Sequence, residues 1–158
     1  MISRSKKTPF LQGDTELVDK NVVLRKISEL ETYQKQIEEF SDITIQEYKS
    51  DWKLQRIIER TLQMMIETCV DIAHHIISDK DMRPPTSYAD TFNILLENNI
   101  IEPELYAIMD KMIKFRNIVV HRYEDVDAEI VATIIKKHIG DFKNFEEAIL
   151  KYLKTENK

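Results

Sequence analysis

Apolar residues recur at every third or fourth position along most of this chain, the spacing that places them on one face of an α-helix. The first segment with this pattern covers residues 18–40. The positions that it predicts to face the core are Val23, Ile27, Leu30, Tyr33 (or Gln34) and Ile37. We therefore expect an amphipathic helix with one buried stripe.

A second helical segment begins at Ser50 and Asp51, which supply an N-cap and an acidic first turn, and continues to about Ser78. Pro84 and Pro85 prevent further continuation. One stripe of this helix contains Leu54, Ile58, Leu62, Met65, Cys69, Ile72 and Ile76, and further apolar residues lie off it at Ile57, Met64, Ile66, Ala73 and Ile77. A helix that is apolar on more than one face needs more than one neighbour. That neighbour is either another part of the same chain or a second copy in a homodimer.

Two more helices are expected after the prolines. Ser87 is placed to cap a short helix over residues 88–98, with Phe92, Leu95 and Leu96 facing inward. Asn99 follows where many helices end on a residue in the left-handed conformation, which asparagine tolerates. Pro103 suits the first turn of the next helix, whose core positions are Leu105, Ile108, Met109, Met112 and Phe115.

A last helix is expected over residues 127–153, with Gly140 as the site of a bend. Its predicted core residues are Ile130, Ile134, Ile135, Ile139, Phe142, Phe145 and Ile149. Four long helices and one short helix predict an all-α fold, an antiparallel four-to-five-helix bundle.

The composition agrees with a single helical domain. A chain of 158 residues with 42% hydrophobic content is long enough to bury one core. Two glycines and four prolines leave little turn material, which favours a few long helices over many short strands. Residues 1–17 lack apolar periodicity and are predicted to form a flexible N-terminal extension, so that the domain occupies residues 18–158.

Charge and cysteine usage narrow the function classes. The net charge of −5 indicates that the surface as a whole is not built to bind a polyanion, so any contact with RNA is expected to be local. The single cysteine, Cys69, excludes an internal disulfide framework, and its place on an apolar stripe indicates a buried hydrophobe rather than a nucleophile. No apolar run approaches the roughly 18 residues of a membrane span. We therefore expect a cytoplasmic protein that does not contact membranes.

Candidate chemistry is concentrated at the end of the fourth predicted helix, in Arg116, Asn117, His121 and Tyr123. Cleavage of RNA without a metal needs a base for the 2′-OH, an acid for the leaving 5′-oxygen and positive charge beside the phosphorane. A histidine suits either proton transfer, and an arginine fork binds two phosphate oxygens. A phenol positions a phosphate or stacks on a base. By spacing alone, these residues also fit a helix terminus with a cation near its carbonyl end.

Helical geometry complicates this assignment. At about 100° per residue, Arg116 and Tyr123 share a face of an unbroken helix, whereas His121 lies about 140° from Arg116. Either the helix ends within residues 118–120, or the site combines residues from two chains across a dimer axis and so contains two histidines. Asn117 and His121 share a face, and a hydrogen bond between them would orient the imidazole.

Arg116, His121 and Tyr123 form an R-X4-H-X-Y motif, and on this motif the chain resembles the HepT-like branch of the HEPN proteins. The resemblance covers about residue 18 to the C-terminus. Further matching stretches are Asp51-Trp52, Gln55-Arg56, Glu59-Arg60, Leu62-Gln63, Asp71-Ile72-Ala73, Tyr88-Ala89-Asp90-Thr91-Phe92, Phe115-Arg116-Asn117 and Asp141-Phe142. The chain departs from the family in its longer N-terminal extension and in Asn99, which replaces a common glycine.

This resemblance implies a homodimeric, metal-independent endoribonuclease toxin of a prokaryotic toxin–antitoxin pair. It also implies a partner, a minimal nucleotidyltransferase antitoxin similar to enzymes that transfer AMP onto the motif tyrosine, here Tyr123. AMP at that position would set a negatively charged phosphodiester beside Arg116 and exclude an RNA phosphate. No cofactor is expected. The alternatives are a non-catalytic bundle that binds nucleotide or presents substrate to a nucleotidyltransferase, and a purely structural adaptor.

A second polar group lies on the second predicted helix, where Asp71 and His75 are one turn apart and His74 is adjacent. Two ligands on one helix are too few for a zinc site, so no metal is expected. We expect Asp71 and His75 either to form a hydrogen-bonded structural pair or to line the cleft with Arg116 as supporting residues.

Two other sets of polar residues are predicted to lie at the surface. Arg56, Glu59 and Arg60 have the spacing of a solvated, ion-paired helix face, and the arginines there are also placed to guide RNA. His138, beside two lysines, is predicted to be a surface histidine.

Overall fold

The computed structural model describes the backbone of residues 12–156 and the side chains of residues 20–156. Within these residues every regular element is helical, which confirms the all-α prediction. The elements are α1 (Gln12–Glu38), α2 (Ile45–Ser50), α3 (Trp52–Asp79), α4 (Tyr88–Glu97), α5 (Pro103–His121), η2 (Tyr123–Asp125), α6 (Ala128–Thr133), η3 (Ile134–His138) and α7 (Ile139–Glu156). None of these helices combines the length and apolar character that crossing a membrane requires.

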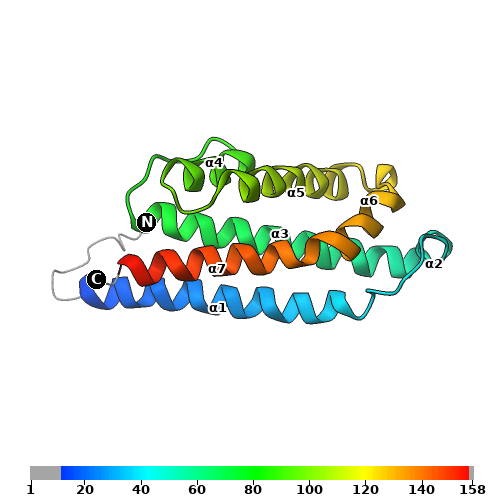
Figure 1. Cartoon of the computed structure of the whole chain (residues 1–158), viewed down its shortest axis with the longest axis horizontal. Helices are drawn as coiled ribbons and strands as arrows, with labels where there is room; N and C mark the ends of the chain where they lie inside the picture. Colours follow the sequence, from blue (N-terminus) through cyan, green and yellow to red (C-terminus); the bar gives the residue numbers. More distant parts are fainter. Residues whose placement is uncertain (1–11, 157–158) are drawn as a thin grey trace, which may run out of the picture.

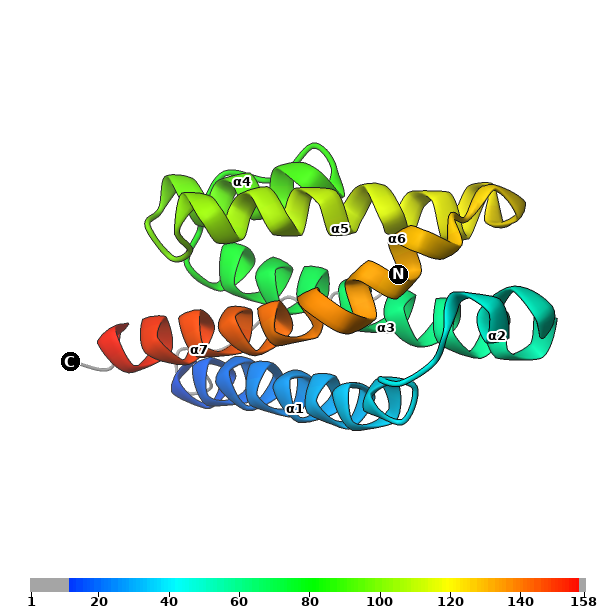
Figure 2. The same cartoon turned by 45° about the vertical axis from the view of Figure 1, so that its right-hand side comes forward.

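The long helices α1, α3, α5 and α7 lie side by side and alternate in direction, so the chain forms the predicted antiparallel bundle (Figure 1). Helix α3 is central, since it packs against α1 on one side and against α4 and α5 on another. The short helix α4 lies beside the start of α5, and α2 and α6 lie at the opposite end of the bundle (Figures 1 and 2). The end of α5 is therefore next to the start of α3.

The central position of α3 explains its apolar residues off the main stripe. Ile66, Ala73 and Ile77 are buried inside the chain, so packing within one monomer accounts for them. Ile57, by contrast, is 52% exposed. Packing within the monomer therefore explains Ile66, Ala73 and Ile77 but not Ile57, which no described part of the chain fully covers.

Several helix ends lie where the capping residues and prolines predict them. Asp51 Oδ1 accepts hydrogen bonds from the backbone N–H of Lys53 (3.0 Å) and of Leu54 (3.2 Å) at the start of α3. Ser87 caps α4, and Pro103 is the first residue of α5. Asn99 has a φ of 58°, which confirms the left-handed conformation predicted for it.

Two expectations about the helices were wrong, and one helix was not predicted. Helix α1 begins at Gln12 rather than at residue 18, and residues 1–11 of the predicted extension lie outside the described residues. Helix α2 was not predicted, although Thr44 and Glu47 form a capping box at its start. The last helix departs from α geometry in the π-helical turn η3, before Gly140 rather than at it.

The π-helical turn also explains an error in the predicted core. Ile130 is 46% exposed, whereas Phe142, Phe145 and Ile149 are fully buried. A π turn contains an extra residue, so helical faces before and after it fall out of phase. Ile130 lies before the turn and is therefore rotated away from the face that α7 buries.

Candidate functional site

The R-X4-H-X-Y motif lies at the C-terminal end of α5 and in the single turn of η2 that follows (Figure 2). Helix α5 continues through residues 118–120 to His121, and the N–H of Arg122 still donates to the carbonyl of Ile118 (2.8 Å). The expectation that the helix ends within residues 118–120 is thus wrong. Val119 is buried against the core, and this burial outweighs the mild helix preference lost by its β-branching.

Arg116 is held in place by groups from three helices. Its Nε donates to Glu67 Oε2 (2.8 Å), and Gln63 Nε2 donates to the same oxygen (3.0 Å). Its Nη1 donates to Asn117 Oδ1 (3.1 Å), and its guanidinium carbon lies 4.8 Å from the ring centroid of Tyr88. Among the described contacts, Nη2 is left to bind a ligand. The side chain is 16% exposed, so the cation is ordered and still reachable.

A second row of groups supports Tyr88 from behind. The His74 ring meets the Tyr88 ring edge-on, with centroids 6.1 Å apart. His74 Nε2 lies 3.1 Å from Thr91 Oγ1, and that hydroxyl donates to the carbonyl of Ser87 (3.0 Å). Because the hydroxyl proton is used on Ser87, His74 Nε2 must be the donor of the first bond. The bond from His74 attaches α4, and with it Tyr88, to α3, and the bond to Ser87 fixes the Thr91 hydroxyl within α4.

Sequence reasoning missed Glu67, Gln63 and Tyr88 as partners of Arg116. A signal for them does exist, since Gln63, Glu67 and His74 recur on one face of α3 at intervals of four and seven residues. That polar row on an otherwise buried helix requires polar partners on the neighbouring helices.

His121 and Tyr123 have different surroundings. Tyr123 is 51% exposed, and its ring lies over the guanidinium of Arg56 on α3, 4.8 Å from the carbon to the centroid. Arg116 and Tyr123 both contact α3, but they do not share a face of one helix as expected, because α5 ends at His121 and Tyr123 lies in η2. His121 is exposed. Because α5 is unbroken, His121 lies about 140° around the helix from Arg116, so one chain does not bring the two side chains to one point.

The structure separates Asp71 from these contacts. Asp71 Oδ2 lies 3.6 Å from Lys26 Nζ on α1, while Arg116 contacts Glu67, and His75 is half-buried. A supporting role for Asp71 and His75 stays a prediction. Within the described part of the chain, no three His, Cys, Asp or Glu side chains are grouped so as to hold a metal ion.

The expectation of a solvated face at Arg56, Glu59 and Arg60 is wrong for its central member. Glu59 is 4% exposed, with one oxygen accepting from Tyr48 Oη (2.5 Å) and the other from Arg56 Nη1 (2.9 Å). Burial and the Glu59 carboxylate raise the pKa of the Tyr48 phenol far above its usual range. The phenol therefore remains a donor, and Glu59 is a buried anchor for Arg56.

Cys69 and His138 both lie apart from the motif. Cys69 is fully buried, as predicted, and burial raises the pKa of its thiol well above the usual value. A buried thiol that resists ionisation is not a nucleophile. His138, predicted to lie at the surface, is half-buried, and its Nδ1 lies 2.7 Å from Asp141 Oδ2.

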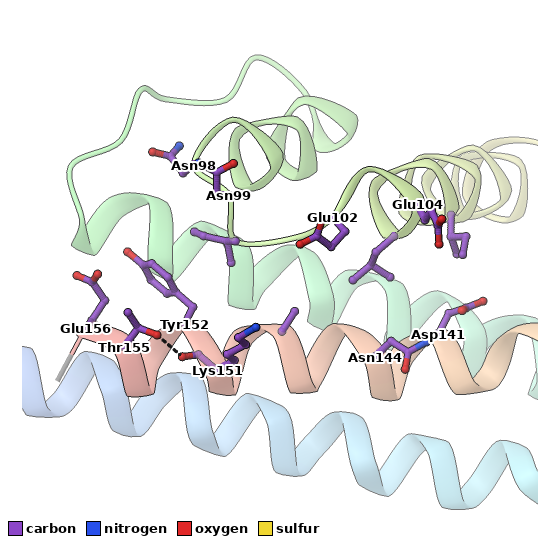
Figure 3. Close-up of a pocket in the computed structure, with 14 residues that line it drawn as sticks. Asn98, Asn99, Glu102, Glu104, Asp141, Asn144, Lys151, Tyr152, Thr155 and Glu156 are labelled. Carbon is purple, nitrogen blue, oxygen red and sulfur yellow. Dashed lines mark hydrogen bonds between the residues drawn. The ribbon is translucent and has the colours of Figure 1, made fainter. Parts of the chain in front are cut away.

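A separate cleft of about 560 Å³ lies between the α4–α5 connection and α7 (Figure 3). Carboxylates and amides dominate its polar lining, including Glu102, Glu104, Asp141 and Asn144. From Glu104 to Arg116 the helix rises about 18 Å, so this cleft does not include the motif. Its acidic lining also disfavours a phosphate ligand.

Comparison with known proteins agrees with this geometry. The model of the family described as Ribonuclease HepT-like matches residues 30–149. The mRNA nuclease HepT of Shewanella oneidensis is 32% identical over 130 residues, which cover 82% of this chain and 96% of that protein. The tRNA nuclease HepT of Aphanizomenon flos-aquae is 28% identical over 123 residues, covering 78% and 84% of the two chains.

Among solved structures, the chain is similar to the tri-AMPylated HEPN toxin of Shewanella oneidensis in complex with its MNT antitoxin. The TM-score is 0.76 at 32% identity, and the match covers 82% of this chain and 97% of that one. The similarity extends over nearly the whole of the relative, including the helices that position Arg116.

Proposed function

The chain belongs to the HepT-like ribonuclease family, and from this membership we propose that it is a metal-independent endoribonuclease, the toxin of a toxin–antitoxin pair. Arg116 and His121 are its catalytic residues, and Asn117 and Tyr123 support them. The observation that carries the proposal is the Arg116 guanidinium, which Glu67 and Tyr88 hold at the end of the helix that also presents an exposed His121. The protein acts on RNA in the cytoplasm.

The reaction needs two proton transfers. A base removes the proton of the 2′-OH, the 2′-oxygen forms a bond to phosphorus, and the bond from phosphorus to the 5′-oxygen breaks as an acid protonates that oxygen. Arg116 Nη2 is placed to neutralise the non-bridging phosphate oxygens as charge builds on them. An imidazole serves as the base in one form and as the acid in the other.

The unbroken helix α5 supports a site built from two chains, since His121 and Arg116 of one chain point in different directions. An apolar groove of about 580 Å³ between α5 and α6 is lined by residues that include Phe115, Ile118 and Ile130. His121 lies about 60° around α5 from Ile118, next to this groove. A second copy that covers the groove would bring its own α5 close to His121, so that a homodimer supplies both histidines.

Regulation acts at Tyr123. The solved relative is a tri-AMPylated toxin bound to an MNT antitoxin, and the exposed Tyr123 is accessible to a partner of that class, a minimal nucleotidyltransferase. Transfer of AMP from ATP to the phenol oxygen forms a phosphodiester and releases pyrophosphate and the phenol proton. The modified Tyr123 lies in η2, directly after the helix that carries Arg116. The added negative charge and volume exclude the RNA backbone.

Cleavage of total RNA by the chain produced without a partner tests the proposal. His121→Ala should abolish cleavage while circular dichroism shows the same helical content, because His121 is exposed and makes little contribution to packing. If neither protein cuts RNA, and the intact mass shows an unmodified chain, the nuclease proposal fails. A non-catalytic, nucleotide-binding role would then account better for the site.

A further inference from the structure

Arg56, on the first turns of α3, is fixed in place although its side chain is 43% exposed. Its Nη1 donates to Glu59 Oε1 (2.9 Å), and Glu59 is itself buried and bonded to Tyr48. The ring of Tyr123 covers one face of the guanidinium, 4.8 Å from its carbon. An exposed arginine usually loses rotamer freedom when it binds a ligand, which weakens binding. The side chain of Arg56 is already held in the folded protein, so binding costs less conformational entropy here.

The bonds that hold Arg56 leave donors free. A guanidinium carries five N–H groups, and among the described contacts the bond to Glu59 uses Nη1. Stacking on an aromatic ring leaves the remaining in-plane donors available, in the fork that matches two phosphate oxygens. Glu59 already supplies the carboxylate partner of Arg56 within the chain. The remaining N–H donors are therefore available to a phosphate.

The surroundings of Arg56 are locally cationic. Lys53 and Arg60 are exposed on the same first turns of α3, and Glu59, the acid among them, is buried. Exposed acids lie nearby at Asp51, Glu124 and Asp125, so the positive charge is confined to the face of α3 that carries Lys53, Arg56 and Arg60. Binding of a polyanion to an acidic protein depends on such local groups.

Arg56 is too far from Arg116 to share one phosphate with it. Arg116 lies five residues before the end of α5, a rise of about 7.5 Å, and Tyr123, which stacks on Arg56, lies beyond that end in η2. Glu67, which binds Arg116, is eleven residues from Arg56, a rise of about 16 Å along α3. Both guanidinium groups lie along the contact between α3 and α5, so one extended strand can reach both.

We propose that Arg56 forms a second RNA phosphate-binding site, which binds the strand away from the phosphate held at Arg116. The inference rests on the proposed function, because it assigns a further contact for the same RNA. Glu59 and Tyr123 are positioning residues for Arg56. AMP on Tyr123 would place its phosphate within reach of this guanidinium and compete with the RNA there.

Binding of a single-stranded 2′-O-methyl RNA oligonucleotide tests this site separately from cleavage, because the methyl group blocks attack by the 2′-oxygen. Affinity is measured over a range of salt concentrations for the full chain, Arg56→Gln, Arg56→Lys and Arg25→Gln. Arg25 is an exposed arginine of α1, so it controls for the loss of one positive charge. Circular dichroism and thermal unfolding of each variant establish that the fold is intact.

Arg56→Gln should weaken binding roughly tenfold and lower the salt dependence, the slope of log K against log salt, by about 0.7. Arg56→Lys should keep the slope and recover part of the affinity, and Arg25→Gln should bind as the unchanged protein does. Equal affinity and slope for Arg56→Gln and Arg25→Gln would overturn the site, as would failure of the unchanged protein to bind. If Arg56-dependent binding is seen without cleavage of unmodified RNA, the nuclease fails and this site stands.

Discussion

Glu146 on α7 is a carboxyl group in the core, and its ionisation should make the protein less stable as the pH rises. The side chain is 1% exposed, and neither of its oxygens has a hydrogen-bond partner among the described residues. Lys143 Nζ, 3.7 Å from Glu146 Oε1, is shared with Glu31 at 3.6 Å. Burial, with a further contribution from the negative charge of Glu31, raises the pKa of Glu146 to about 7.

The size and sign follow from linkage between protonation and folding. The ordinary pKa is 4.5, so between pH 4.5 and about 7 the folded state holds a proton that the unfolded state releases. The stabilising contribution is complete below pH 4.5 and is lost as the pH rises through 7. At about 1.4 kcal/mol per pKa unit, the loss is about 3 kcal/mol.

Glu146→Gln removes this dependence, because an amide does not ionise. The free energy of unfolding is measured by urea denaturation for the variant and for the unchanged protein. The difference, variant minus unchanged protein, should be about 3 kcal/mol larger at about pH 8 than at about pH 4. Comparing the two pH values cancels any constant cost of burying the amide. Glu129→Gln, the same change at an exposed position of α6, should show no such trend. Parallel stability curves for Glu146→Gln and the unchanged protein would refute the reasoning.

Two further predictions concern Arg116 and the α4–α5 connection. Glu67→Gln replaces the anionic partner of Arg116 by a neutral one and should slow single-turnover RNA cleavage about tenfold with an unchanged circular dichroism spectrum; an unchanged rate would show that Glu67 does not position the guanidinium. Asn99 has a φ of 58°, a conformation that glycine adopts without strain and alanine does not. Asn99→Gly should therefore stabilise the protein and Asn99→Ala should destabilise it. Their free energies of unfolding in urea should differ by about 1 kcal/mol. Equal stability of Asn99→Gly and Asn99→Ala would contradict this.

The fold was largely predictable because its signals are local. Asp51, Ser87, Asn99 and Pro103 each act on backbone groups within a few residues, so their effects follow from the sequence around them. The π-helical turn was not predictable in this way. It depends on how α6 and α7 both reach the core, a property of the whole bundle, and it moved Ile130 to the surface.

In the site, too, local features were predictable and contacts between distant residues were not. The residues of the motif follow from their spacing in the sequence. Their distant partners do not, since Glu67 and Arg56 come from α3 and Tyr88 comes from α4, and Glu67 lies 49 residues before Arg116. Spacing also left open whether α5 breaks within the motif. The structure removes that option, since α5 stays helical to His121. Because the intact helix holds Arg116 and His121 on different faces, the proposed chemistry predicts a homodimer in which the α5 of a second copy brings its own residues to the phosphate.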